Sequence, residues 1–288
     1  MQNKITAVIP AHNEERTIIE IINKVLIYCD YVVVVNDSSK DNTQKILNNY
    51  KNKKLIILEN TKRLGIGGSM KKGIRKALEL NPEIIIKIDA DGQHKPEDIP
   101  KFIEKLEESN YDLIKGNRFF DIESLEKMPK IKMLGNLITT NIQKIVSGNY
   151  AISDPNNGFL AIRSSKLKLI KLNQLNNEYF FENSLIIIFN AHNFKIGEVG
   201  VETIYRDEKS SIPILFAALK IIPIFAFLLF KKNILSAKLQ LSINSITFFL
   251  GIFVFLINVL LKIQILWFLI LFLILIYLLT DVINFISK

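Results

Sequence analysis

Four short runs of apolar, largely β-branched residues divide roughly the first hundred positions of this 288-residue chain. Each run ends in a polar loop, and a helical pattern follows the loop. The runs are Ile5–Ile9, Tyr31–Val35, Leu55–Leu58 and Ile84–Ile88. Strand, loop and helix repeated in this order predict a mostly parallel, right-handed βαβ sheet whose loops gather along one edge. The predicted fold class is therefore α/β.

The loop after the fourth run carries the most informative pair of residues. Asp89 and Asp91 stand one residue apart at the expected carboxyl end of a strand, where open α/β sheets bind ligands. Two neighbouring carboxylates repel each other unless a cation lies between them. Because Mg²⁺ takes one or two carboxylates together with phosphate oxygens and water, the pair predicts a divalent ion bound with a diphosphate. A solvated acidic turn is the alternative for an isolated Asp-x-Asp.

Three motifs occur in order at compatible spacing, over Val8–Glu15, Val35–Thr43 and Asp89–His94. Together they resemble the GT-A glycosyltransferases of family 2. Within that family the chain is most similar to the polyprenyl-phosphate hexosyltransferases, such as the dolichol-phosphate mannose synthases, over about residues 4–212. The resemblance implies a Rossmann-like GT-A fold, a nucleotide-sugar donor (GDP-mannose or UDP-glucose), Mg²⁺ or Mn²⁺, and a polyprenyl or dolichyl phosphate acceptor.

The resemblance also assigns residues to the donor side of the site. Pro10, His12 and Glu14 would hold the ribose and base, and Asp37 would accept a hydrogen bond from a nucleobase N–H. On the residues alone, Asn13 equally suits a helix N-cap, and Asp37 equally suits a turn. Arg63 and Gly67 would also contact the nucleotide. They belong to a glycine-rich loop before a basic helix, and a helix N-terminus favours phosphate.

For the metal, the lipid-phosphate branch of the family gathers three positions, which here are Asp89, Asp91 and Gln93. The three histidines are scattered among different motifs, so the close ligand pairs of a zinc site are not present in the sequence. Cys29 is the single cysteine, so neither a disulfide framework nor a thiolate metal site is expected.

The acceptor side is predicted from the middle of the chain. Arg118 lies in a segment similar to the family's Gly-Ser-Arg-Tyr, where it would grip a phosphate with two parallel hydrogen bonds. Lys132 and Asn136 stand where the family has Arg and Ser, and Lys keeps the charge but lacks the planar fork. Arg206 lies in a terminal loop of the family and would neutralise the diphosphate or the lipid phosphate.

The acceptor decides which chemistry the carboxylates must supply. A phosphate monoester is already ionised, with a second pKa of about 6, so it needs no strong base. A sugar hydroxyl does need one. Asp154 and Glu182, which match the family's acceptor loop and the following helix start, are predicted to organise that loop, or to supply the base if the acceptor is a hydroxyl. Asp91, Arg118, Lys132 and Arg206 are the other predicted catalytic residues. A membrane glycosyltransferase acting on a hydroxyl and a non-catalytic membrane scaffold are the alternatives.

The last third of the chain changes character. Positions 239–261 contain no charged residue over 23 positions, and positions 263–280 contain none over 18. Since about 20 apolar residues span a bilayer, these segments predict a transmembrane hairpin that turns at Lys262. Two core helices of a larger soluble domain are the alternative, but no polar face is left to meet water.

The flanking charges predict how the chain lies at the membrane. Lys231, Lys232 and Lys238 precede the first span, against one lysine in the turn, so the catalytic domain of this integral membrane protein is predicted to be cytoplasmic. With these spans, a net charge of +9 fits anionic membrane lipids and phosphates rather than nucleic acid. The predicted organisation is a catalytic domain over residues 1–211, an interfacial helix over 212–238, with a third span as the alternative, and two transmembrane helices over 239–288.

Overall fold

The computed structural model describes residues 4–108, 110–120, 133, 136, 139–141, 143, 144, 147, 149 and 151–204. All of them belong to the first of the two units into which the chain divides, Met1–Lys232. Lys132, Arg206, the predicted interfacial segment and the two predicted spans lie outside the described residues. Within the described residues, no helix combines the length and the apolar character needed to cross a bilayer.

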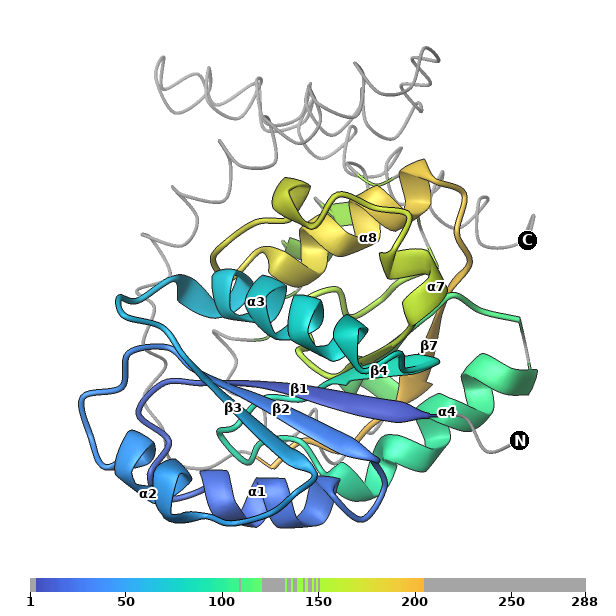
Figure 1. The fold of residues 1–288 in the computed structure, drawn as a ribbon. Coiled ribbons are helices and arrows are strands. Elements are labelled where there is room, and N and C mark those ends of the chain that lie inside the picture. Colours follow the sequence, from blue (N-terminus) through green and yellow to red (C-terminus); the bar gives the residue numbers. More distant parts are fainter. Residues whose placement is uncertain are drawn as a thin grey trace, which may run out of the picture. The chain divides into compact units, whose positions relative to one another are not determined.

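A seven-stranded sheet organises the described part of the chain (Figure 1). Its strands are β1 (Ile5–Ala11), β2 (Tyr31–Asn36), β3 (Leu55–Glu59), β4 (Ile84–Lys87), β5 (Leu113–Asn117), β6 (Leu160–Arg163) and β7 (Ile196–Gly200). Their spatial order is β3-β2-β1-β4-β6-β5-β7. The pairs β1–β2, β1–β4, β2–β3 and β5–β7 are parallel, whereas β6 runs antiparallel to both β4 and β5. The prediction of a mostly parallel α/β sheet is confirmed.

Helices cover both faces of this sheet (Figure 1). On one face lie α1 (Ile18–Val25), α2 (Thr43–Asn49) and α4 (Ile99–Glu108). On the other face lie α3 (Gly65–Glu79), α7 (Ser164–Leu167) and α8 (Phe181–Ala191). Short 3-10 helices occur at Pro96–Asp98, Arg118–Phe120 and Leu172–Gln174.

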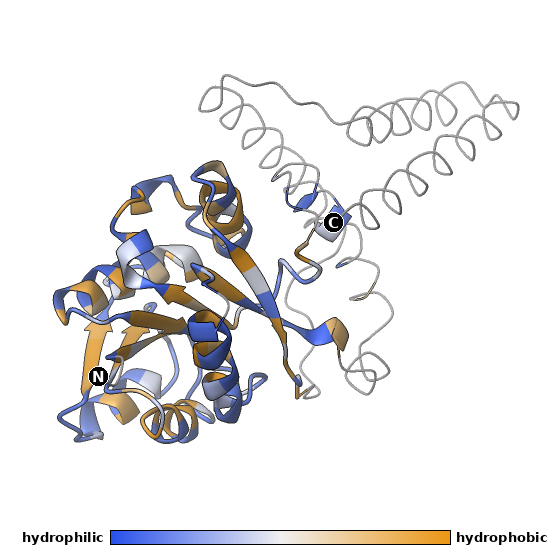
Figure 2. Cartoon of the chain, turned by 90° about the vertical axis from the view of Figure 1, so that its right-hand side faces the viewer, coloured by the Kyte–Doolittle hydropathy of each residue, from blue (hydrophilic) through white to orange (hydrophobic). Residues whose placement is uncertain are grey.

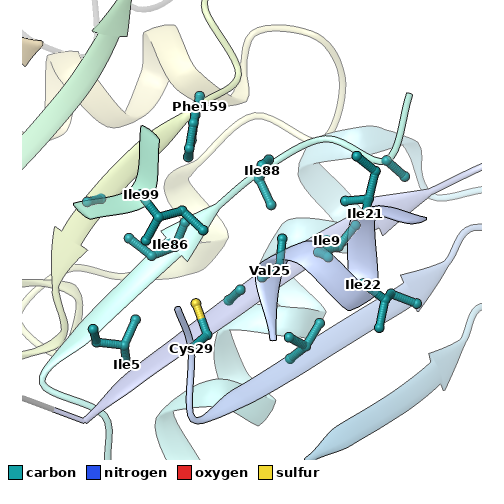
Figure 3. Packing of buried hydrophobic residues seen from close by; sticks show 14 of the residues in the cluster. Ile5, Ile9, Ile21, Ile22, Val25, Cys29, Ile86, Ile88, Ile99 and Phe159 are labelled. Carbon is teal, nitrogen blue, oxygen red and sulfur yellow. The ribbon is translucent and has the colours of Figure 1, made fainter. Parts of the chain in front are cut away.

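Two apolar cores form because successive side chains of a strand point to opposite faces of the sheet. In β1, Ile9 packs in the core beneath α1, and Val8 packs in the core beneath α3. Figure 3 shows the first core, where Ile9, Val25 and Ile86 come together with the single cysteine, Cys29. Figure 2 shows mostly apolar strands, with helices around them that carry both polar and apolar residues. Burial on both faces explains why these strands read as unbroken apolar runs.

Several local predictions differ from the structure in position, and β1, β2 and β3 each end one or two residues later than predicted. β4 ends at Lys87, one residue earlier than predicted. The glycines predicted to form a loop before a basic helix instead form the first turn of that helix, because α3 begins at Gly65. Asn13 does not cap α1, which begins at Ile18, and its φ of 61° is left-handed. The loop after β1 covers residues 12–17 and so lies two residues later than the sequence indicates.

Candidate active site

The loops that follow β1 and β2 form one side of the candidate site, and hydrogen bonds join them. The backbone N–H of Asp37 donates to the carbonyl of Ala11 over 2.8 Å, and Nδ1 of His12 lies 2.8 Å from the carbonyl oxygen of Asp37. The backbone N–H of Glu14 donates to Thr43 Oγ1 over 2.8 Å. The residues predicted to hold the nucleotide here therefore lie in a segment of defined shape. They are Pro10, which lies within β1, and His12 and Glu14, which lie in the loop that follows.

Asn13 joins these two loops with both its backbone and its side chain. Its backbone N–H donates to Ser39 Oγ over 2.9 Å, and its side-chain oxygen accepts from the backbone N–H of Lys40 over 2.8 Å. Its left-handed φ of 61° is a conformation that Asn adopts more readily than most residues. Asn13, for which the sequence also allowed a helix cap, thus joins the two donor-side loops.

Asp37 lies buried at the centre of the donor side. Its Oδ1 accepts hydrogen bonds from Asn60 Nδ2 and from the backbone N–H of Leu64, both over 2.8 Å. Its Oδ2 accepts from the backbone N–H of Gly65 over 2.9 Å. The carboxylate therefore holds the loop between β3 and α3 against the end of β2. Contact with a nucleobase stays a prediction for Asp37, and it would use the remaining lone pairs of these oxygens.

The first turn of α3 is packed against the segment that precedes α8. A Cβ atom on Gly67 would lie 2.1 Å from the carbonyl oxygen of Asn176, and one on Gly65 would lie 2.7 Å from that of Asn177. The backbone N–H of Gly68 donates to this Asn177 oxygen over 2.8 Å. These glycines are needed because a second backbone passes directly over them. Nucleotide contacts by Gly67 and the exposed Arg63 remain predictions.

Asp89 lies just beyond the end of β4 and is held by two basic residues. Lys87 Nζ is 2.6 Å from its Oδ1, and His94 Nε2 is 3.5 Å from its Oδ2. Burial opposes ionisation, but Lys87 and His94 outweigh it, so the pKa of Asp89 lies well below its usual range. The loop before β6 crosses so close that a Cβ on Gly158 would lie 2.0 Å from Asp89 Oδ2.

Asp91 and Gln93 continue the same turn. The backbone N–H of Gln93 donates to Asp91 Oδ1 over 2.9 Å, and the backbone N–H of Ile204 donates to the Gln93 carbonyl over 3.0 Å. No three His, Cys, Asp or Glu side chains of the described residues form a metal site made by protein alone. Two carboxylates, one of them held ionised, in a turn that also carries Gln93 fit Mg²⁺ or Mn²⁺ whose coordination a diphosphate and water complete.

The acceptor side is built around a buried ion pair. Arg118 Nε is 2.7 Å from Asp154 Oδ2, and its second guanidinium contact reaches Asp154 Oδ1 over 2.8 Å. Burial opposes ionisation of Asp154, but Arg118 outweighs it and lowers the pKa of that carboxyl. The bidentate grip that the sequence predicted between Arg118 and a substrate phosphate is therefore made with Asp154. Asp154 thus fixes the guanidinium of Arg118, and its predicted role toward the acceptor stays a prediction.

Glu198 on β7 supports the same loop. Its Oε1 accepts from the backbone N–H groups of Ser153 and Asp154 over 2.8 and 2.9 Å, and its Oε2 accepts from Asn117 Nδ2 over 2.8 Å. Burial raises the pKa of Glu198, and these hydrogen bonds oppose that shift. The β7 strand thus fixes the loop that carries Asp154.

Glu182, in the first turn of α8, reaches the end of β4. Its Oε1 lies 2.9 Å from Lys87 Nζ, so Lys87 joins Glu182 to Asp89. Burial lowers the pKa of Lys87, but these two carboxylates outweigh it and raise the value above that of an ordinary lysine. The structure therefore brings Asp89, Asp154 and Glu182 into one connected region, and their predicted roles in the reaction stay predictions.

Sequence reasoning missed three members of this region, namely Lys87, Lys115 and Glu198. Both lysines are fully buried within strands. The available signal was a lysine inside an otherwise apolar strand, as in Ile86-Lys87-Ile88, where a solvent-facing residue has no place in a sheet covered on both faces. Glu198 left no such signal, since its partners become neighbours only when β5 and β7 pair.

This mixed sheet, with two carboxylates at the end of β4 and an acceptor-side loop before the antiparallel strand, defines a GT-A glycosyltransferase. The chain belongs to glycosyl transferase family 2, and the model of that family matches residues 6–170. It is therefore an enzyme of the glycosyltransferase class, as the sequence predicted.

Individual proteins agree with this assignment. The UDP-N-acetylglucosamine–dolichyl-phosphate N-acetylglucosaminyltransferase of Methanococcus voltae is 33% identical over 218 residues, which are 70% of this chain and 86% of that protein. A dolichyl-phosphate beta-glucosyltransferase of Trichomonas vaginalis is 28% identical over 216 residues, 68% of this chain and 63% of that protein. The crystal structure of glucosyl-3-phosphoglycerate synthase from Mycobacterium tuberculosis with Mn²⁺ and UDP-glucose has a TM-score of 0.55 at 19% identity, covering 80% of this chain and 79% of that one. It shares the fold.

Proposed function

We propose that this glycosyltransferase moves a sugar from a nucleoside diphosphate sugar to a polyprenyl or dolichyl phosphate, with inversion at the anomeric carbon. An oxygen of the acceptor phosphate forms the new bond to that carbon. The bond from the carbon to the donor diphosphate breaks, and its electron pair leaves with the nucleoside diphosphate. No proton has to be removed from an acceptor whose second pKa is about 6.

The observation that carries this proposal is the state of the two acceptor-side carboxylates. Asp154 is engaged at both oxygens by Arg118, and Glu182 is paired with Lys87. Against the opposing effect of burial, Arg118 lowers the pKa of the Asp154 carboxyl, which makes it a weak base for a sugar hydroxyl. Lys87 Nζ lies 2.9 Å from the Glu182 carboxylate, where it takes up an oxygen that a base would need. An anionic acceptor needs no base. The two relatives support the same acceptor, since both names include dolichyl phosphate.

For the donor, we propose a UDP-linked sugar, with N-acetylglucosamine as the first to test. The support is the Methanococcus voltae relative, whose name gives this donor and which this chain matches over 86% of its length. UDP-glucose and GDP-mannose, the donors expected from the sequence, are the next two to compare.

We further propose that Asp89 and Asp91 hold Mg²⁺ or Mn²⁺, with Gln93 beside them. When bound, the ion would offset the charge of the leaving diphosphate. The support is the low pKa of Asp89 and the Mn²⁺ in a crystal structure of the same fold. Around it, Lys87 and His94 orient Asp89. Arg118, Lys132 and Arg206 are the cations proposed to bring the acceptor phosphate to the donor.

We also propose that the reaction takes place at a membrane, with the catalytic domain in the cytoplasm. The support is the sequence, in which positions 239–261 and 263–280 carry no charge. After Cys29→Ser, a Lys262→Cys variant should react with an impermeant thiol reagent applied to the face opposite the catalytic domain. Labelling of Lys262→Cys from the cytoplasmic face alone would refute the hairpin.

The function itself is tested with the purified full-length protein in detergent. The protein is incubated with polyprenyl phosphate and, separately, radiolabelled UDP-N-acetylglucosamine, UDP-glucose and GDP-mannose, with an Asp91→Asn variant as the inactive control. One donor should give an acid-labile lipid whose mass equals one polyprenyl chain, one phosphate and one sugar. A labelled glycoside with no phosphate at the new linkage would eliminate the phosphate acceptor in favour of a hydroxyl.

A further inference from the structure

Two fully buried lysines hold the loop that leads into β6 from opposite sides. Lys115 on β5 donates through Nζ to the carbonyl of Asn157, and Lys87 on β4 donates to the carbonyl of Gly158 over 3.0 Å. In the sheet, both lysines pair in register with Leu160, the first residue of β6. Two successive carbonyls are thus each bound by an ammonium from a different neighbouring strand.

This loop, Asp154–Gly158, connects the two sides of the site. Asp154 at its start holds Arg118, and Gly158 at its end lies against the carboxylate of Asp89. A shift of the loop would therefore move Arg118 relative to Asp89. Lys87 also contacts Asp89 directly, whereas the hydrogen bond described for Lys115 goes to the loop. Lys115 is the residue through which the loop can be perturbed without touching Asp89.

We propose that Lys115 is a positioning residue for the acceptor phosphate, because its buried ammonium fixes the Asp154–Gly158 loop and, through Asp154, the guanidinium of Arg118. Lys115 is fully buried, so it acts through the loop rather than by touching a substrate. This inference rests on the proposed function, in which the acceptor is a lipid phosphate.

Five charged residues from neighbouring strands, the loop and α8 surround Lys115. Lys87 lies on β4, Arg118 follows β5, Asp154 lies in the loop and Glu182 on α8, while Glu198 pairs opposite Lys115 on β7. Burial lowers the pKa of Lys115 to about 8, against the opposing effect of Glu182 and Asp154, and Lys87 and Arg118 lower it further. Lys115 therefore loses its charge just above neutral pH.

Loss of that charge weakens the hydrogen bond from Lys115 Nζ to the Asn157 carbonyl. Hydrogen bonds from a charged donor are roughly twice as strong as those between neutral groups. Above pH 8 or so, the neutral amine of Lys115 should hold the Asn157 carbonyl less firmly, and use of the acceptor should decline. Donor binding should not change, because Lys115 has no described contact with the loops after β1 and β2.

The test uses the full-length protein and its Lys115→Met and Lys115→Arg variants, with Lys168→Met, an exposed lysine of the acceptor half, as the matched control. Kinetics are measured from pH 6 to 10 with polyprenyl phosphate varied at saturating nucleotide sugar, and UDP binding is measured by calorimetry. Lys115→Met should raise the KM for polyprenyl phosphate at least about fivefold while UDP binding stays within about twofold. Lys115→Arg should retain acceptor use and lose the decline above pH 8, because Arg does not titrate in this range.

A Lys115→Met variant with the KM and the alkaline decline of the wild type would overturn the inference. A folded Lys115→Met variant that loses UDP binding would overturn it as well. Should that variant fail to fold, as seen by circular dichroism, Lys115→Arg decides, because an unchanged decline near pH 8 in Lys115→Arg also overturns the inference. Failure of the proposed function is seen separately in the wild type. If the wild type forms no sugar–phosphate–lipid product, the lipid-phosphate acceptor falls, and the role of Lys115 in positioning it falls too.

Discussion

The donor half of the described domain, from β1 to β4, and the acceptor half, from β5 to β7, hold their functional loops by different means. In the donor half, hydrogen bonds rather than buried ion pairs join the loops that follow β1 and β2, as where Asn13 binds Ser39 and Lys40. In the acceptor half, buried charges do it, as where Arg118 binds Asp154. Asp37, the buried carboxylate after β2, accepts from neutral donors. The buried Lys87, the last residue of β4, belongs to the boundary of the two halves, where it pairs with Asp89 and Glu182.

Hydrogen bonds and buried ion pairs differ in how much free energy of unfolding is lost when one partner is substituted. A neutral hydrogen bond contributes about 1 kcal/mol net, so several of them make a loop that tolerates losing one. Removing one partner of a buried ion pair costs about 3–5 kcal/mol, because the other charge stays buried and uncompensated. The acceptor half should therefore be the less tolerant half, and its geometry the more sharply fixed.

The largest effect should come at the boundary of the two halves, where Asp91 lies. Asp91→Asn should lower the rate of sugar transfer at least about 100-fold, the scale of losing one main electrostatic stabiliser. The measurement is turnover in Mg²⁺ or Mn²⁺ and after EDTA, with the exposed Glu97→Gln as the control. Undiminished turnover of Asp91→Asn in the presence of EDTA would contradict the metal role of Asp91.

The ion pair of the acceptor half gives the next largest effect. Asp154→Leu should lower the free energy of unfolding by about 3–5 kcal/mol, because Arg118 is left buried without its partner. The double variant Arg118→Met/Asp154→Leu should recover most of that loss and yet remain unable to use the acceptor. Chemical denaturation followed by circular dichroism, beside acceptor kinetics, measures both. A double variant no more stable than Asp154→Leu would show that the pair is not the main support of this half.

The same division explains how far the sequence could predict the fold. In the donor half, each strand is followed directly by the loop that serves the site, so the strands and Asp37, Asp89 and Asp91 could be placed from local pattern alone. The predicted strand ends differ from the observed ones by one or two residues, because apolar periodicity does not resolve where a ladder stops.

The contacts of the acceptor half could not be predicted from local sequence, because the residues that contact each other are distant along the chain. Arg118 meets Asp154 across 36 positions, and Lys87 meets Gly158 across 71. Those contacts form because β6 lies antiparallel between β4 and β5. No local sequence pattern predicts this position of β6. The resemblance to the family found Arg118, Asp154 and Glu182, but the lysine that joins Glu182 to Asp89 required the structure.

The third prediction concerns the pH dependence of stability in the acceptor half. The folded state lowers the pKa of Lys115 from 10.5 to about 8, so between these values the unfolded chain binds more protons at this site. Stability contributed by Lys115 should then rise with pH across this window, by about 3 kcal/mol at most. Acceptor use should fall in the same window. The measurement is the unfolding free energy of wild type minus that of Lys115→Met at pH 7.5 and 10. A difference that does not change with pH would show that Lys115 keeps its proton.

The smallest expected effect lies at Asn13, in the donor half. Asn13→Ala should lower the free energy of unfolding by about 1 kcal/mol for two reasons. Alanine adopts a left-handed φ of 61° less readily than asparagine does, and the substitution removes the oxygen that accepts the hydrogen bond from the backbone N–H of Lys40. Asn13→Gly removes the same hydrogen bond but keeps the backbone conformation accessible, so its cost should be about half as large.

The kinetic consequence should be equally local. Both Asn13 variants should raise the KM for the nucleotide sugar a few-fold and leave the KM for polyprenyl phosphate unchanged, because Asn13 ties the donor-side loops and has no described contact with the Asp154–Gly158 loop. Donor and acceptor kinetics measured on the same preparations separate the two. If Asn13→Ala costs as much stability as Asp154→Leu, or if it disturbs acceptor use, then the two halves are not held independently, and the contrast between neutral and charged support does not describe this enzyme.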